Sequence, residues 1–195
     1  MRLSTSTNIF WDSCVLARWL TDNPIGFKAD LSAFLDDAKA GKIKIYHSTI
    51  LYAEVRPSLL KPGGFSSVKQ LIADMQSVLF PVAASAPIMQ LAGSIRDHQF
   101  HLPDGVRQAS EKNRIMTVPD AIQLATCIHL RDDQGVSDIE FHTYDDGRSR
   151  NYEQKAVSLL KLEDYARHLS AFPDVQRAIT LPRMKPHRRQ PDFPF

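Results

Sequence analysis

The chain has 195 residues, of which 43% are hydrophobic and 24% are charged, and its formal net charge is +2. This length and composition suit one globular domain with a buried core. No segment approaches the roughly 20 consecutive apolar residues that a membrane-spanning helix needs. Residues 1–7 also lack the long apolar stretch of a signal peptide. We therefore expect a cytoplasmic protein with no membrane contact.

Hydrophobic periodicity predicts that strands alternate with helices along the chain. Strands are expected at residues 8–11, 43–46, 79–82, 139–143 and 157–162. Helices are expected at residues 14–20, 31–41, 50–55, 68–78, 86–100, 117–130 and 163–170. This alternation predicts an α/β fold with three layers (α/β/α), in which a mostly parallel central sheet has helices on both faces.

The C-terminal segment differs in composition from the rest of the chain. Residues 182–195 contain four prolines, four basic residues and one acid, and so carry a charge of +3. Because the whole chain carries +2, the preceding residues carry −1. We divide the chain into a domain at residues 1–165 and a C-terminal helix with a basic, proline-rich and flexible tail at residues 166–195.

Four carboxylates are expected at one edge of the sheet. Asp12 and Asp145 directly follow predicted strands, and open parallel sheets bind ligands beyond the carboxyl ends of their strands. Glu54 and Asp120 lie near the starts of helices that point toward the same edge. Carboxylates this close repel one another unless a divalent cation lies between them, and oxygen ligands favour Mg²⁺ or Mn²⁺. Such a site suits phosphodiester hydrolysis, because the metal can activate a water molecule.

Each acid also has a structural explanation. Thr117 and Asp120 have the spacing of a helix capping box. Asp12 is placed to cap the helix that begins near Cys14, and Glu54 has Arg56 as a potential ion-pair partner. Asp145 and Asp146 lie beside Gly147 and are candidate turn residues. The case for a metal site therefore rests on the shared location of the acids and not on any one of them.

Four segments resemble, in order and spacing, the motifs of PIN-domain nucleases. They are residues 10–16, 48–55, 119–126 and 141–145, which read FWDSCVL, STILYAEV, PDAIQLAT and FHTYD. The resemblance covers roughly residues 8–165. It implies a small PIN-like α/β/α domain and a ribonuclease that depends on Mg²⁺ or Mn²⁺.

The resemblance also assigns roles to individual residues. Those that it implies as metal ligands and catalytic groups are Asp12, Glu54, Asp120 and Asp145. Ser13 and Thr143 would support these ligands by hydrogen bonding. Asp146 directly follows Asp145, so the sequence leaves open which of the two takes the fourth position.

Partners follow from the resemblance as well. Many bacterial PIN-domain proteins are VapC-type toxins, which are silenced by an antitoxin segment inserted into the acidic cleft, and dimers are common. We thus expect an RNA substrate, a cognate antitoxin and a homodimer. Basic residues near the acids are candidates for phosphate contacts, namely Arg56, Arg114 and Arg148. The tail from Arg183 to Arg189 is a further candidate, because of its charge.

Two features of this sequence are not explained by the family pattern. The segment at residues 101–116, predicted to be a loop, is longer than in compact PIN-domain proteins, and the tail is not typical of them.

Three other functions were considered. The first is a non-catalytic module of the same fold that binds RNA or protein. A haloacid-dehalogenase phosphatase would need an acid at position 14, where the chain has Cys14, and a receiver domain would need an acidic pair after the first strand. Cys14 and Cys127 are instead predicted to be buried, reduced thiols.

Overall fold

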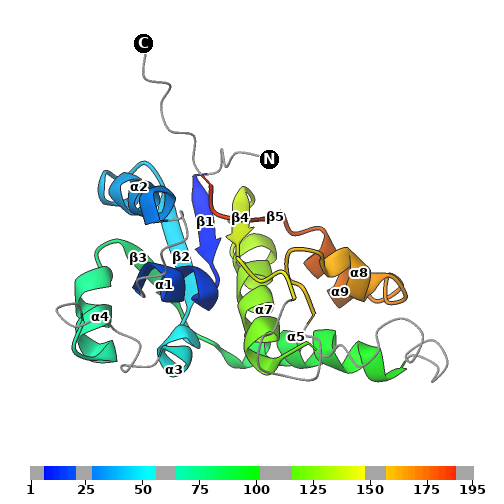
Figure 1. The fold of residues 1–195 in the computed structure, drawn as a ribbon. Coiled ribbons are helices and arrows are strands. Elements are labelled where there is room, and N and C mark those ends of the chain that lie inside the picture. Colours follow the sequence, from blue (N-terminus) through cyan, green and yellow to red (C-terminus); the bar gives the residue numbers. More distant parts are fainter. Residues whose placement is uncertain (1–6, 21–27, 56–64, 102–115, 148–156, 188–195) are drawn as a thin grey trace, which may run out of the picture.

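The computed structural model describes residues 7–20, 28–55, 65–101, 116–147 and 157–187. They form a five-stranded sheet in the order β3-β2-β1-β4-β5, in which all neighbouring strands are parallel (Figure 1). The strands are β1 (Asn8–Trp11), β2 (Lys44–Ser48), β3 (Leu79–Val82), β4 (Ile139–His142) and β5 (Arg183–Met184). The predicted α/β fold is therefore confirmed, and the described sheet is entirely parallel.

Helices cover both faces of the sheet, so the fold has three layers. One layer contains α1 (Ser13–Leu20), α2 (Lys28–Lys39), α3 (Leu51–Glu54) and α4 (Val68–Met75). The other layer contains α5 (Ala86–Asp97), α7 (Val118–Asp132), α8 (Leu162–Ala166) and α9 (Pro173–Ile179). A 3-10 helix, η2 (His98–His101), continues from the end of α5.

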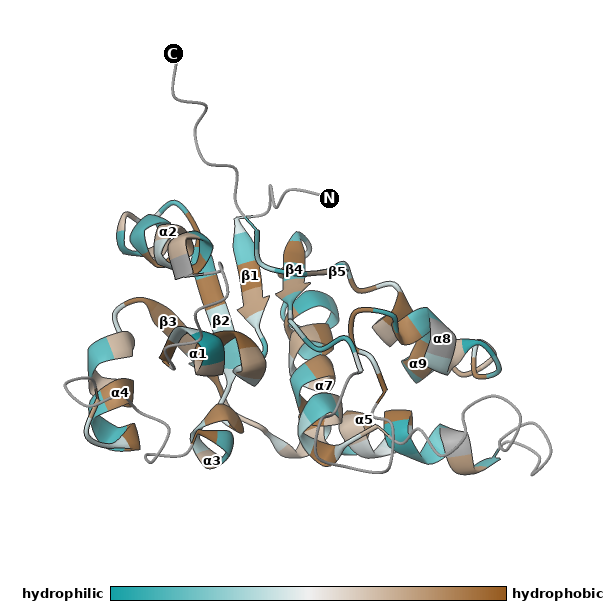
Figure 2. Ribbon diagram, in the orientation of Figure 1, coloured by the Kyte–Doolittle hydropathy of each residue, from teal (hydrophilic) through white to brown (hydrophobic). Residues whose placement is uncertain are grey.

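The strands supply apolar side chains to both layers, because successive residues of a strand point to opposite faces. Phe10 of β1 stacks on Phe141 of β4 within the core formed with α5 and α7, and the ring centroids are 5.4 Å apart. Ile9 and Trp11 pack on the opposite face against α1 and α2. Figure 2 shows hydrophobic residues in β1 and β4, and helices in which hydrophobic and hydrophilic residues are interspersed.

β1 lies in the middle of the sheet, so the residue that follows it lies at the centre of the carboxyl edge. β1 pairs with β2 on one side and with β4 on the other. The backbone N–H of Asp12 donates to the carbonyl of His142 at 3.1 Å, which extends this pairing past the end of β1. In Figure 1, β1 and β4 point down the page toward α3, so the carboxyl edge of the sheet is its lower edge.

The prediction of a strand at residues 157–162 was wrong. Val157, Leu159 and Leu162 are buried in the core that α7 shares, but residues 157–160 form no strand and α8 begins at Leu162. The fifth strand is β5, which pairs with β4. The apolar pattern of residues 157–162 thus reflects burial and not strand pairing.

The prediction of a flexible tail after Leu181 was wrong for residues 182–187. The carbonyls of Pro182 and Met184 accept hydrogen bonds from Phe141 and Thr143 of the β4 segment, at 2.8 and 2.9 Å. Residues 188–195 lie outside the described residues. The tail therefore begins as an edge strand of the sheet.

The contacts of Arg183 explain how β5 accommodates a basic residue. Its side chain is only 4% exposed and forms an ion pair with Glu163. One guanidinium nitrogen donates to the carbonyls of Ala178, Ile179 and Leu181, at 2.7–3.0 Å, and so satisfies the end of α9. Arg183 is therefore unavailable to RNA, which removes one cation from the proposed RNA-binding tail.

Several predicted helices are shorter than expected. The helix predicted at residues 50–55 is α3 (Leu51–Glu54), and it has no side-chain cap. The hydroxyl of Thr49, which precedes α3, accepts from the N–H of Ala84 at 3.2 Å. The helix predicted at residues 163–170 is likewise α8, which ends at Ala166.

Side chains beyond the predicted boundary at residue 165 pack into the core of the main domain. Leu169, Val175, Ala178 and Leu181 are buried in the same apolar cluster as α5 and α7. Within the described residues, we therefore find no break in packing at that boundary. No helix in this part of the chain has both the length and the apolar character that a membrane span requires.

Candidate metal site

Asp12 lies at the centre of the carboxyl edge, directly after β1. Its carboxylate is almost fully buried, with 4% of the residue exposed. Oδ2 accepts from the hydroxyl of Thr143 at 2.6 Å and from the thiol of Cys14 at 3.0 Å. Burial raises the pKa of Asp12 to about 6, the charges of Glu54 and Asp145 add to this rise, and the two hydrogen bonds oppose it. Because both donors contact Oδ2, a metal ion at this carboxylate would bind the other oxygen.

Glu54 reaches the same edge from the end of α3. Its Oε2 accepts from the hydroxyl of Ser13 and from the side-chain amide of Gln123, the latter at 3.1 Å. The amide of Gln123 also donates to Ser13. This network joins α1, α3 and α7 around one carboxylate, and Ser13 makes the supporting contact that the family resemblance implies.

Asp120 reaches the edge from the first turn of α7. Its backbone N–H donates to the hydroxyl of Thr117 at 3.3 Å, so the predicted helix cap is present. Burial raises the pKa of Asp120 to about 7, and the charges of Asp12, Asp145 and Glu54 add to this rise. A residue that served only the helix cap would be stabilised as an anion by the helix dipole. The cap therefore explains the position of Asp120 but not its raised pKa.

Asp145 follows β4, and its charge influences the ionisation of Asp12 and Asp120. Its backbone N–H donates to the hydroxyl of Thr143 at 3.0 Å, and its Oδ1 accepts from the N–H of Gly147 at 2.8 Å. Burial raises the pKa of Asp145, and the charge of Asp146 adds to this rise. Asp146 itself is exposed. Of the two acids, Asp145 is the one whose charge raises the pKa of Asp12 and Asp120.

Four carboxylates from four segments thus act on one another electrostatically at one edge of the sheet. A divalent cation would relieve their repulsion, and their all-oxygen donor set fits Mg²⁺ or Mn²⁺. However, no three His, Cys, Asp or Glu side chains of the described residues are arranged as a ready metal site. One oxygen each of Asp12, Glu54 and Asp145 is turned toward a hydrogen-bond donor. Metal binding would therefore require some of these side chains to rotate toward the ion.

Three basic residues are predicted to contact RNA. Arg56, Arg114 and Arg148 all lie outside the described residues. Their prediction stands as it was made.

Two residues at the site were not predicted to take part in it. Cys14, predicted to be a buried thiol, is partly exposed, donates to Asp12 and accepts from the N–H of Tyr144 at 3.2 Å. Burial raises the pKa of this thiol, and so does the charge of Asp12. Gln123 lies one turn after Asp120 and is 1% exposed. A glutamine within an otherwise apolar helical stretch, three residues after Asp120, is the sequence signal that would have identified it.

Comparisons with known proteins do not assign the chain to a family. No protein-family model matches the sequence, and a comparison with curated proteins gives no match.

Proposed function

We propose that this chain is a PIN-like ribonuclease that hydrolyses RNA with the help of Mg²⁺ or Mn²⁺. The observation that carries this proposal is the raised pKa of Asp12 and of Asp120 at the carboxyl edge of the sheet, where burial is the main cause and the charges of Glu54 and Asp145 add to both rises. Strongly raised pKa values at one ligand-binding edge favour a functional site over a set of unrelated surface acids. The four ordered motifs favour the nuclease among metal-dependent functions.

The residues of this site divide into ligands and their supports. Asp12, Glu54, Asp120 and Asp145 would hold the ion, which when bound supplies Lewis acidity to the phosphate and to the attacking water. Thr143 and Cys14 hold Asp12 by one oxygen. Ser13 and Gln123 hold Glu54 in the same way. These contacts would steady Asp12 and Glu54 beside the ion and leave their other oxygens to bind it.

Cleavage of a labelled structured RNA tests this proposal. Wild type is incubated with Mg²⁺ or Mn²⁺, beside an EDTA control and the Asp120→Asn variant purified in the same way. Asp36→Asn is the matched control, because Asp36 is an exposed aspartate of α2. We expect cleavage by wild type and Asp36→Asn, and at least a ~100-fold loss in Asp120→Asn, the scale of removing a group that stabilises the transition state. Equal cleavage by all three proteins would contradict the assigned site.

A non-catalytic module of the same fold is the second candidate. It is favoured by the lack of a ready metal site among the described residues. Such a module would bind RNA or protein without cleaving it and would show no change in stability with Mn²⁺. Both results together would replace the nuclease proposal.

A VapC-type toxin would also have protein partners. We propose that the chain acts in the cytoplasm, pairs with a cognate antitoxin and forms a homodimer. Co-expression with the product of a small neighbouring reading frame, followed by size-exclusion chromatography with light scattering, tests both associations. A monomer that neither binds nor is inhibited by that product would contradict this part of the proposal.

A further inference from the structure

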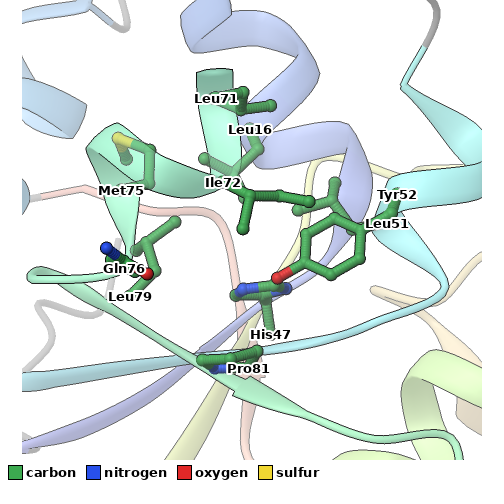
Figure 3. Close-up of a pocket in the computed structure, with 10 residues that line it drawn as sticks. All are labelled: Leu16, His47, Leu51, Tyr52, Leu71, Ile72, Met75, Gln76, Leu79 and Pro81. Carbon is green, nitrogen blue, oxygen red and sulfur yellow. The ribbon is translucent and has the colours of Figure 1, made fainter. Parts of the chain in front are cut away.

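A mostly apolar pocket lies beside α1 and α3. It is a cavity of about 100 Å³ between α1, α3, α4 and the ends of β2 and β3 (Figure 3). Its walls are mostly aliphatic, and His47 and Tyr52 supply two rings whose centroids lie 5.5 Å apart. Ligand pockets for drug-sized molecules are typically ~300–1,000 Å³. This cavity therefore suits a single flat ring system and not a whole nucleotide.

His47 gives this apolar pocket a defined hydrogen-bonding character. The residue is 3% exposed, and its Nδ1 lies 3.1 Å from the carbonyl oxygen of Ser48. Because a carbonyl only accepts hydrogen bonds, Nδ1 carries the proton and Nε2 carries a lone pair. Burial lowers the pKa of His47, which favours this neutral form. No partner for Nε2 is found in the described part of the chain, so Nε2 is available to accept a hydrogen bond.

The pocket shares two helices, α1 and α3, with the network around the carboxylates. Leu16 lines it from α1, three residues after Ser13, and Leu51 lines it from α3, three residues before Glu54. Residues three apart on a helix lie on one face, about one turn or ~5.4 Å apart. None of the lining residues carries a charged side chain at neutral pH. A group bound in the pocket is therefore expected to be flat, uncharged and able to donate a hydrogen bond.

We propose that this pocket receives an unpaired, amino-bearing nucleobase of the RNA, adenine above all, next to the bond that is cut. The proposal rests on the proposed ribonuclease function for the identity of the polymer. The aliphatic walls and Tyr52 contact the faces of the base, and Nε2 of His47 accepts from its exocyclic amino group. The charged phosphates stay outside, toward the carboxylate edge.

Protein-observed NMR titration in EDTA tests the pocket without any cleavage. Adenosine is compared with purine riboside, which lacks only the amino group, and with N-acetyl-leucinamide, which imitates an apolar side chain of a protein partner. We expect saturable shifts at the pocket with adenosine and roughly tenfold weaker binding of purine riboside, because Nε2 would remain unpaired. Equal binding of the two purines, preference for the leucine amide, or no binding would each overturn the proposal.

Two variants locate the binding, and one serves as control. His47→Asn keeps a donor toward Ser48 but has no atom at the position of Nε2, so it should bind both purines equally. Ile72→Trp fills the cavity from α4 and should abolish binding, whereas Met89→Trp on the exposed side of α5 should leave it unchanged. Binding by wild type that both pocket variants retain would assign adenosine to another place and overturn the proposal.

Competition with RNA distinguishes a base in a strand from a free nucleoside. In EDTA, an oligouridine with one central adenine should displace adenosine, and oligouridine alone should not. Lack of displacement by the adenine-containing strand would overturn the proposal in favour of a nucleoside site. None of these binding experiments depends on cleavage. A protein that binds adenosine in the pocket but cleaves no RNA would therefore contradict the nuclease proposal and leave the pocket proposal standing.

Discussion

Asp120 is the residue whose ionisation is most strongly tied to the proposed metal. Its pKa of about 7 in the folded protein lies above the value of 3.8 for an unperturbed aspartate. The folded protein therefore keeps this proton over a pH range in which the unfolded chain has lost it. It follows that the metal-free fold loses stability as the pH rises from about 4 to about 7, and that no further loss comes from Asp120 above that range.

The Asp120→Asn variant tests this pH dependence. Asparagine does not ionise, so without metal the variant should become more stable relative to wild type as the pH rises from 5 to 7.5. We expect a relative gain of about 2–4 °C in Tm, which corresponds to roughly 1 kcal/mol for a domain of this size. Thermal unfolding in EDTA, followed by circular dichroism, measures it. A difference in Tm that does not vary with pH would show that Asp120 ionises normally.

Thr143 should control how well Asp12 binds metal. Thr143→Val keeps the size of the buried side chain but removes the donor to Oδ2 of Asp12. We expect Mn²⁺ affinity to fall about 10- to 100-fold, the usual effect of losing a support of a metal ligand. Thr126→Val is the matched control, since Thr126 is equally buried on α7 and hydrogen-bonds Ser48 and Ile122. Equal loss in both variants would indicate a general packing effect.

At the scale of elements, β5 depends on Arg183. Arg183→Ala leaves the carbonyls at the end of α9 without their donor and Glu163 without its partner. We expect a loss of about 2–4 kcal/mol in the free energy of unfolding, because several hydrogen bonds to a buried charge are removed together. Urea denaturation measures this loss. Lys185→Ala, an exposed position two residues later, should change stability by less than ~0.5 kcal/mol.

The same element shows where sequence patterns reach their limit. α7 was predictable, because Thr117 and Pro119 at its start and a long apolar face after them all favour a helix. β5 was not, since a two-residue strand has no periodicity and Arg183 is charged. Its position depends on pairing with β4, which lies about 40 residues earlier. Long-range pairing of this kind leaves no local signal for a sequence pattern to detect.

At the scale of the whole molecule, the carboxyl edge was predictable and its internal contacts were not. Asp12 and Asp145 follow strands, and in a parallel sheet this fixes the edge at which they lie. The network of Ser13, Glu54 and Gln123 joins three helices that are far apart in sequence. That Nε2 of His47 is an acceptor also follows only from the fold, because it depends on the contact of Nδ1 with the carbonyl of Ser48.

The central claim is that four carboxylates of one fold form a single divalent-metal site. Calorimetric titration of the wild-type protein with Mn²⁺ at pH 7.5 tests it most directly, with Asp12→Asn as the test variant and Asp36→Asn as the control. We predict saturable binding by wild type and Asp36→Asn, and its loss in Asp12→Asn. No binding by wild type, or equal binding by Asp12→Asn, would contradict the claim.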